Sequence, residues 1–496
     1  MRWKRVGGIL ILVLFCSLVT ALHFTTLRKT MNGWNWSVPV DDTYIHLHYA
    51  RGIANGHPFR YHAEDGYSTG CTSPLYVVLL SGFFVAGLDG LDLVPITLIL
   101  GGVWLLLSML LLMHVGVQLG NRSAGRMAAA LWGTWGFTWY CTHCGMETGL
   151  WIVMVLALLS TFIAWSKQES LTPRWPLLLV AALVPLTRPE GIVLLGVVGL
   201  VALHRIARSC PWRLWVRPMA AWAVALLPSA AYYLTNRILT GTFSTAGMTS
   251  KSLLPAPDID STARWARYGG ARPSTASHFR AWQDPYILRM ATSLPGHAAL
   301  GPLPLCNSEL TLQARGPHLA LRLWTVLLLL FASAHYIRIA RWERYYLPFF
   351  LMIIMGQGFF LTWVARAVAR PWFAAMAVIV LIFFQGDNNV RWIKKYAADI
   401  TTIHEKQAAA AKAARALPKG ARLIVCDAGA IPYLSGKWTF DLVGLTTPLG
   451  HNYFRNGVGS RFELFERLPK KKRPTHIAAY GFCLWHGAEG EIISMH

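Results

Sequence analysis

The chain has 496 residues, of which 54% are hydrophobic and 14% charged, and its formal net charge is +23 at pH 7. Apolar runs recur over most of its length, which indicates a polytopic membrane protein rather than an ordinary soluble domain. In a soluble protein this charge would suggest nucleic acid, but basic cytoplasmic turns and contact with anionic lipid explain it here. We therefore expect a lipid bilayer, and no nucleic acid, as a partner.

The first apolar run, residues 6–26, is long enough to cross a bilayer. Basic residues precede it, which favours a cytoplasmic start: Arg2, Lys4 and Arg5. No small-residue cleavage site clearly follows it, so we treat it as a retained segment. The next stretch, 28–92, is then a first outer loop, and it contains the adjacent carboxylates Asp41 and Asp42.

Asp41 and Asp42 are the strongest chemical signal in this loop. Two carboxylates so close cannot ionise independently, so one should have a raised pKa unless a cation or metal lies between them. A carboxyl group of this kind suits acid–base chemistry. The alternative is that the pair only caps the following helix, for which one Asp is enough. His46 and His48 follow closely and are interpreted as polar helix residues rather than ligands.

The first half of the chain alternates between apolar segments and polar turns. The segments are 74–87, 93–119, 127–141, 149–165, 175–187, 192–203 and 218–234. The first of these is too short to span and predicts an interfacial or re-entrant helix. Basic turns mark the cytoplasmic side and contain Arg126, Lys167, Arg174, Arg205, Arg208, Arg213 and Arg217. A long outer loop, 236–317, follows.

This topology brings a set of charged residues to the extracytoplasmic side: Asp41, Asp42, Glu147, Arg188, Glu190 and Lys251. The outward segments 127–141 and 175–187 are shorter than the ~20 residues of a full crossing, so their ends should lie below the outer interface. Polar backbone at that depth is tolerated only where it is buried or lines a water-filled cavity, and we therefore expect an outward-facing cavity. The charge on Arg188 at that depth indicates function, although an Arg188–Glu190 pair that only locks a turn remains an alternative.

The second half is less regular, and its topology stays open. Residues 318–336, 346–363 and 372–386 are apolar and, counted alone, give a cytoplasmic C-terminus. A further span within 284–305 would instead make the tail extracytoplasmic.

Residues 387–496 have a soluble composition and predict a small α/β domain. A helix is expected at 403–416 and strands at 421–425 and 475–480. No glycine-rich phosphate-binding motif occurs, so a bound nucleotide is not supported. The spacing of Cys141 and Cys144 allows a disulfide, half a metal site or simple packing of small residues.

Several short motifs together resemble the GT-C superfamily of membrane glycosyltransferases, and are most similar to the mycobacterial arabinofuranosyltransferase branch and its bacterial relatives. They are Asp41-Asp42, Tyr49-Ala-Arg51, Thr72-Ser-Pro-Leu75, Gly145-Met-Glu-Thr148, Leu186-Thr-Arg-Pro-Glu-Gly191, Arg344-Tyr-Tyr-Leu-Pro348 and Asp427-Ala-Gly-Ala430. The resemblance runs over most of the chain. It implies an all-α polytopic membrane domain over 1–386, with about 10–11 transmembrane helices, and an extracytoplasmic α/β domain over 387–496.

Enzymes of this superfamily take a sugar from a polyprenyl-phosphate carrier and pass it to an acceptor hydroxyl at the outer membrane face. The resemblance thus implies transfer of arabinofuranose, or another pentose or hexose, to a cell-envelope glycan, lipid or protein. It places the protein in the inner (cytoplasmic) membrane, with the active site facing the periplasm or cell exterior. The essential carboxylate of the first outer loop maps onto Asp41 or Asp42.

The residues themselves suggest the same chemistry. A general base must accept the acceptor hydroxyl's proton, and we assign Asp41 to this role, with Asp42 tuning it, holding a metal or binding the acceptor. Cations must stabilise the leaving phosphate, and the candidates are Arg188, Lys251 and Arg344. The candidates for substrate binding are Tyr44, Tyr67, Glu147 and Glu190.

No cofactor is required by this reading, and a divalent metal ion is optional because no cluster has convincing ligand spacing. A lipid-linked-sugar flippase or a secondary transporter is the alternative function. Such transporters usually show related halves with broken helices at matching positions, and the sequence shows none.

Overall fold

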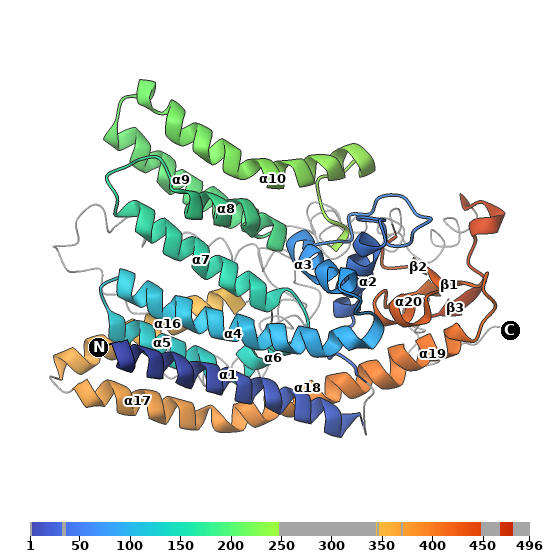
Figure 1. The fold of residues 1–496 in the computed structure, drawn as a ribbon, viewed down its shortest axis with the longest axis horizontal. Helices are drawn as coiled ribbons and strands as arrows, with labels where there is room; N and C mark the ends of the chain where they lie inside the picture. The colour runs from blue at the N-terminus through green and yellow to red at the C-terminus, as the bar shows by residue number, and fades with distance from the viewer. Residues whose placement is uncertain are drawn as a thin grey trace, which may run out of the picture.

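The computed structural model describes residues 2–31, 36–247, 344, 347–368, 371–447 and 467–479. Within them, long helices lie side by side and a small sheet lies beyond one end of the bundle (Figure 1). Five of the described helical segments are long and apolar enough to cross a membrane: Gly7–Thr30, Gly90–Gln118, Thr148–Ser166, Gly191–Ser209 and Leu347–Ala367. The chain is a multi-pass membrane protein.

The helices of the first half follow the predicted segments closely. They are α1 (Arg2–Thr30), α2 (Asp42–Ala54), α3 (Pro74–Val85), the 3-10 turn η1 (Gly90–Asp92), α4 (Leu93–Gln118), α5 (Arg122–Gly133), α6 (Gly136–His143), α7 (Thr148–Ser166), α8 (Trp175–Thr187), α9 (Gly191–Ser209), the 3-10 turn η2 (Trp212–Leu214) and α10 (Val216–Thr240). The apolar runs set these helices, because in a bilayer the backbone must satisfy its own hydrogen bonds.

One predicted segment, 127–141, differs: it forms two helices, α5 and α6, with a break between them. Asn389 of α18 (Gly386–Ile403) occupies the break, where its Oδ1 accepts the Gly136 N–H at 2.6 Å and its Nδ2 donates to the Thr134 carbonyl at 2.8 Å. A Cβ on Gly136 would lie 2.8 Å from the Asn389 Cα. The distant amide therefore replaces hydrogen bonds that a continuous helix would make.

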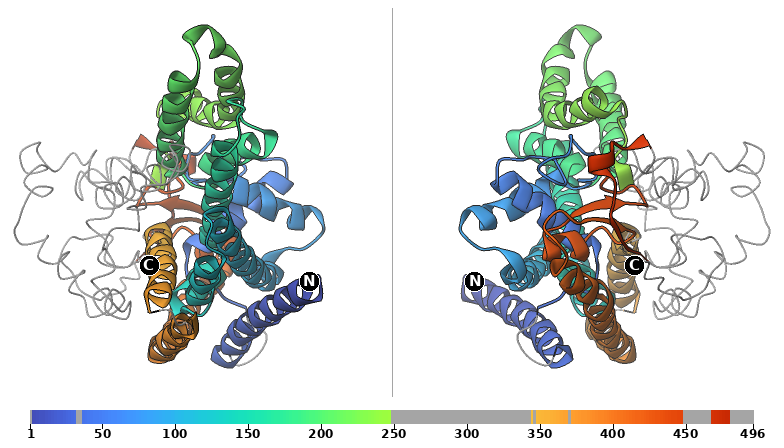
Figure 2. Two further views of the ribbon diagram at one scale, coloured as in Figure 1. Left: turned by 90° about the vertical axis from the view of Figure 1, so that its left-hand side faces the viewer. Right: turned by 90° about the vertical axis from the view of Figure 1, so that its right-hand side faces the viewer.

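The helix ends separate into a basic end and a polar end. The turns between α4 and α5, α7 and α8, and α9 and α10 lie at the left in Figure 1 and carry the basic residues assigned to the cytoplasm. The start of α7, the end of α8, α2, α3 and the sheet lie toward the right. Seen end-on, α10 and α1 lie at opposite edges (Figure 2).

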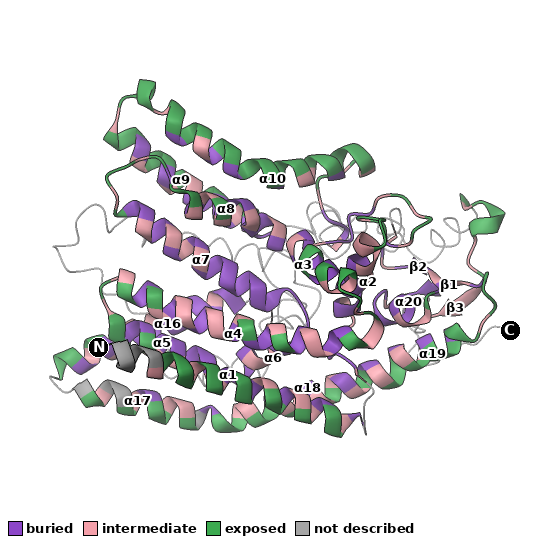
Figure 3. Cartoon of the chain, in the orientation of Figure 1, coloured by how far each residue is buried: buried purple, intermediate pink, exposed green. Residues whose placement is uncertain are grey.

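Burial separates the centre of the bundle from its rim. Of the apolar 18-residue stretch of each helix, 78% is buried in α7 and 17% in α1. The contrast is visible along the two helices (Figure 3). An apolar helix that exposes most of its side chains is expected to face lipid, whereas one surrounded by other helices forms the core. The residue at the start of α7, Glu147, therefore lies at the centre of the polar end.

The second half adds helices and the sheet. The elements are α16 (Leu347–Ala367), α17 (Pro371–Phe384), α18 (Gly386–Ile403), a π-helical turn η5 (His404–Ala408), α19 (Ala409–Arg415), β1 (Arg422–Val425), α20 (Ala430–Ser435), β2 (Trp438–Asp441), the 3-10 turn η6 (Lys470–Lys472) and β3 (His476–Ala478). The strands are parallel in the order β2-β1-β3, with Ile424 opposite Phe440 and Ile477. Trp392 and Tyr396 of α18 are buried, so this helix connects the membrane bundle to the sheet.

The sheet lies at the same end of the helix bundle as α2 and the loop that follows it (Figure 1). Ser68 donates to the Thr446 carbonyl at 2.9 Å, and Arg422 pairs with Glu64 at 2.7 Å. The C-terminal region and the loop that contains Asp41 therefore lie against each other. The further span considered within 284–305 lies outside the described residues.

We expect cysteine labelling to show that the loop after α2 and the C-terminal region lie on one side of the membrane. In intact cells or sealed vesicles, an impermeant thiol reagent should label Ala63→Cys and Lys471→Cys from one side, and Arg122→Cys and Arg208→Cys only from the other. All four positions are exposed. The unsubstituted protein gives the background, and labelling of positions 63 and 471 from opposite sides would contradict the fold.

Candidate functional site

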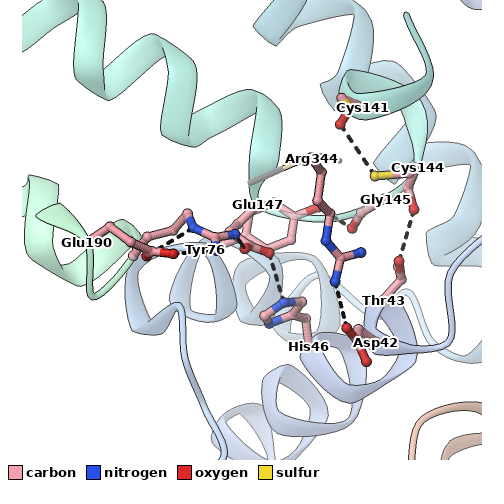
Figure 4. Close-up of polar contacts among 11 residues, drawn as sticks. Asp42, Thr43, His46, Tyr76, Cys141, Cys144, Gly145, Glu147, Glu190 and Arg344 are labelled. Atoms are coloured by element: carbon pink, nitrogen blue, oxygen red, sulfur yellow. Dashed lines mark hydrogen bonds and ion pairs between the residues drawn. The ribbon is translucent and has the colours of Figure 1, made fainter. Parts of the chain in front are cut away.

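Helix α2 places two polar side chains on one face. Asp42 and His46 are four residues apart, so they are neighbours on the helix surface. Thr43 anchors the same helix to the loop before α7, because its Oγ1 donates to the Cys144 carbonyl at 2.9 Å. Figure 4 shows α2 presenting both Asp42 and His46 toward arginine and glutamate side chains from later segments.

The turn before α7 brings Glu147 to this face. Gly145 has a φ of +80°, which an L-residue rarely adopts, and a Cβ there would lie 2.6 Å from Thr43 Cγ2. Tyr76 of α3 donates from its hydroxyl to the Gly145 carbonyl at 2.9 Å. The glycine therefore allows α2 and α3 to pack directly on the turn, and Glu147 is buried beneath them.

Arg188 follows the end of α8, and the chain there is extended with φ −157° and ψ 146°. The proline at 189 favours this extended conformation in the residue before it. Arg188 holds Glu190 with two nitrogens, Nη2 at 2.8 Å and Nε at 3.2 Å, and Nη1 donates to Glu147. His46 Nε2 lies 3.0 Å from the second Glu147 oxygen. The prediction that these charges converge is therefore met for Glu147, Arg188 and Glu190.

Asp42 faces a different arginine. Its Oδ2 lies 2.7 Å from Arg344 Nη2, and the guanidinium comes from a residue 302 positions later in the chain. The arginine side chain is largely buried. A carboxylate beside a fixed cation is favoured in its ionised form, so this contact supports an ionised Asp42.

Asp41 makes another kind of contact, with the turn before α20. Its Oδ2 accepts the Gly429 N–H and its Oδ1 accepts the Ala430 N–H, each at 2.8 Å. Its side chain makes no capping bond to α2, so the interpretation of Asp41 as a helix cap is wrong. Burial and the neighbouring carboxylates of Asp427 and Asp42 raise the pKa of Asp41 to about 8, although the two amides act in the opposite direction.

The remaining predicted residues lie away from this arrangement or outside the described chain. Tyr44 is fully buried, with its ring 5.6 Å from that of Tyr433. Tyr67 donates to Asn236 Oδ1 at 2.6 Å. The structure thus gives both tyrosines partners within the chain, while Lys251 is not among the described residues.

The sequence did not identify two residues of this polar site, His46, which contacts Glu147, and Tyr76, which contacts the turn before α7. The i to i+4 spacing from Asp42 to His46 was the available signal, whereas nothing local marks Tyr76.

Cys144 is a thiol that donates to the Cys141 carbonyl at 3.3 Å, so the interpretation of this pair as a disulfide is wrong. The described residues contain no group of three or more histidine, cysteine or carboxylate side chains placed to hold a metal ion.

Comparisons with known proteins point to one fold. Residues 393–489 match a family described as a domain of unknown function, DUF8728. A search of curated proteins finds no match. ArnT from Cupriavidus metallidurans bound to undecaprenyl phosphate is 14% identical, with a TM-score of 0.51 over 95% of this chain and 93% of that one.

Two further solved structures are similar. The oligosaccharyltransferase AglB from Archaeoglobus fulgidus, in complex with an inhibitory peptide and a dolichol-phosphate, is 12% identical, with a TM-score of 0.55 over 96% of this chain and 70% of that one. Arabinofuranosyltransferase AftD from Mycobacteria is 16% identical, with a TM-score of 0.49 over 84% of this chain and 29% of that one, too low a score to support an argument. The chain therefore has the GT-C fold, as the sequence motifs predicted.

Removing Arg188 should destabilise the fold, because Glu147 and Glu190 would then lie buried without their shared cation. We expect Arg188→Ala to lose ~3–5 kcal/mol of stability, as for other broken buried ion pairs. Thermal unfolding of the detergent-solubilised protein measures this loss, with the exposed Arg208→Ala as the matched control. Equal melting temperatures for the two variants would contradict the buried pairing.

Proposed function

We propose that the protein is a membrane glycosyltransferase that moves a sugar from a polyprenyl-phosphate donor to an acceptor hydroxyl of the cell envelope. One observation carries the proposal: α2 sets Asp42 against Arg344 and, one turn on, His46 against the Glu147–Arg188–Glu190 group. The GT-C fold supports it, since similar structures contain undecaprenyl phosphate or dolichol-phosphate. Arabinofuranose, another pentose and a hexose remain the candidate sugars.

In this proposal Asp42 is the general base. It accepts the proton of the acceptor hydroxyl as the oxygen bonds to the sugar's anomeric carbon, while the bond to the carrier phosphate breaks and its electron pair leaves with the phosphate. The sequence favoured Asp41, but both oxygens of that carboxyl already accept amide N–H groups, from Gly429 and Ala430. The Arg344 contact favours ionised Asp42.

The leaving phosphate gains charge in the transition state and needs a fixed cation. A planar guanidinium matches phosphate oxygens in pairs, which an ammonium does not. In our proposal the guanidinium of Arg344 binds the phosphate oxygens in this way, since it lies beside the general base Asp42. Arg188 was a second candidate for this role, but its guanidinium already binds the carboxylates of Glu147 and Glu190, and Lys251 remains a further candidate. Loss of one such donor costs ~3 kcal/mol in comparable sites.

The site faces the extracytoplasmic side in this proposal, in the inner membrane of the cell. Basic residues gather in the turns at the opposite end of the bundle, as expected of a cytoplasmic face. Cys426 is disulfide-bonded, and disulfides persist mainly in oxidising compartments. The strand region that contains it contacts the first outer loop, so the same compartment would contain the site.

Transfer should depend on Asp42. We expect Asp42→Asn to lower the transfer rate by roughly 10²- to 10⁴-fold, the usual contribution of a general base. Purified protein is incubated with radiolabelled polyprenyl-phosphate sugars and envelope acceptors, with and without EDTA to decide the optional metal ion. The control is Asp92→Asn, an exposed carboxylate at the start of α4.

Two results would count against the proposal. If Asp42→Asn kept the wild-type rate with a verified donor, the carboxylate would have no catalytic role. If the wild type transferred no sugar from any donor but moved the lipid-linked sugar between leaflets of a vesicle, a flippase would replace the enzyme.

A further inference from the structure

The segment 429–433 of the C-terminal region contacts α2 at both of its ends. At the start, the Asp41 carboxyl accepts the amides of Gly429 and Ala430. At the other end, Arg51 donates to the Tyr433 carbonyl at 3.1 Å, and its guanidinium lies 4.0 Å from the centre of the Tyr433 ring. One short segment therefore spans the helix that bears Asp42 and His46.

The approach at Gly429 is close enough to require glycine. A Cβ there would lie 2.0 Å from the Asp41 carbonyl oxygen and 2.6 Å from its Oδ2. Any residue can adopt the φ of −96° found at Gly429. The close approach of Asp41, and not the backbone conformation, therefore excludes a side chain at this position. A substitution at this position thus tests the contact itself.

Neighbouring contacts hold the same segment in place. The Tyr61 hydroxyl donates to the Ala428 carbonyl, and Gln407 Nε2 donates to Asp427 Oδ2 at 2.7 Å. The Tyr433 hydroxyl donates to the Gly90 carbonyl at 2.7 Å, which ties the segment to the turn before α4. Segment 429–433 is consequently fixed to the membrane bundle as well as to α2.

We propose that segment 429–433 is a positioning element for the reaction, which holds Asp41 and Arg51 so that Asp42 is aimed at the acceptor hydroxyl. This inference rests on the proposed function. Asp41 and Asp42 are consecutive, so fixing the first side chain on the C-terminal region fixes the direction of the second toward Arg344. Asp41 is then a positioning residue, and the matched domain of unknown function is part of the transferase site.

The test uses the full-length protein and the substitution Gly429→Ala. We expect kcat to fall about 10- to 100-fold, the usual effect of a displacement of about 1 Å at a reacting group. The KM for the donor should stay unchanged, since Arg344 and Arg188 are untouched. Hydrogen exchange should rise in peptides covering α2 and stay constant in α7. The control is Gly420→Ala, where the new Cβ meets no atom within 4 Å.

Further variants distinguish a positioning role of Asp41 from direct proton transfer by its carboxyl group. Asp41→Asn combined with Gly429→Ala should be no slower than the slower single variant, because both changes break one contact. Arg51→Lys should also lower kcat, since a lysine lacks the planar stacking on Tyr433. The pH profile of the Asp41→Asn enzyme should keep the same rising limb as the wild type.

Three outcomes would overturn the inference. The first is a Gly429→Ala protein that keeps the wild-type kcat while α2 exchanges faster, and the second is a Gly429→Ala protein in which the exchange of α2 does not change. Alternatively, a wild-type limb near pH 8 that disappears in Asp41→Asn would make Asp41 the base. Failure of the proposed function is distinct, because the wild type would then transfer no sugar even though the exchange measurement still reported the contact between segment 429–433 and α2.

Discussion

A single guanidinium held between two buried carboxylates organises the polar end of the protein. Arg188 joins the turn between α8 and α9 to the start of α7 through Glu147, and His46 extends the group to α2. Water is scarce at such a position, so an unpaired charge is costly. Each member consequently restricts where the others can lie, and three distant segments are fixed relative to one another.

The depth of this group follows from the length of a helix. α8 has 13 residues, which gives about 20 Å against the ~30 Å of a bilayer's hydrocarbon core. A helix of this length that starts near one face of the membrane ends before the opposite interface, so Arg188, which follows α8, lies below that interface. The shortness of this segment was visible in the sequence. The same depth explains why Arg188 pairs with both Glu147 and Glu190, because an unpaired charge is costly there.

The sequence predicted most of the helices and part of the site. Apolar runs and basic turns were sufficient to place Glu147, Arg188 and Glu190 together, because counting crossings assigns each turn to one side. The partners of Asp41 lie 388 residues away, and no periodicity or spacing connects the two. The break at residue 135 likewise depends on Asn389, a contact made only in three dimensions. Long-range polar contacts of this kind leave no local pattern.

The adjacent aspartates show how one motif can serve two purposes. Consecutive residues at the start of a helix point about 100° apart, so the two carboxyl groups cannot face the same partner. Burial and the neighbouring carboxyl groups raise the pKa of Asp41, against the effect of the two amides that it accepts, whereas Asp42 meets a guanidinium that favours its ionised form. Two identical side chains are thereby pushed toward opposite protonation states, as is common where two carboxyl groups share a site. Because the amides that hold Asp41 belong to the C-terminal region, the orientation of Asp42 is set from outside the membrane bundle.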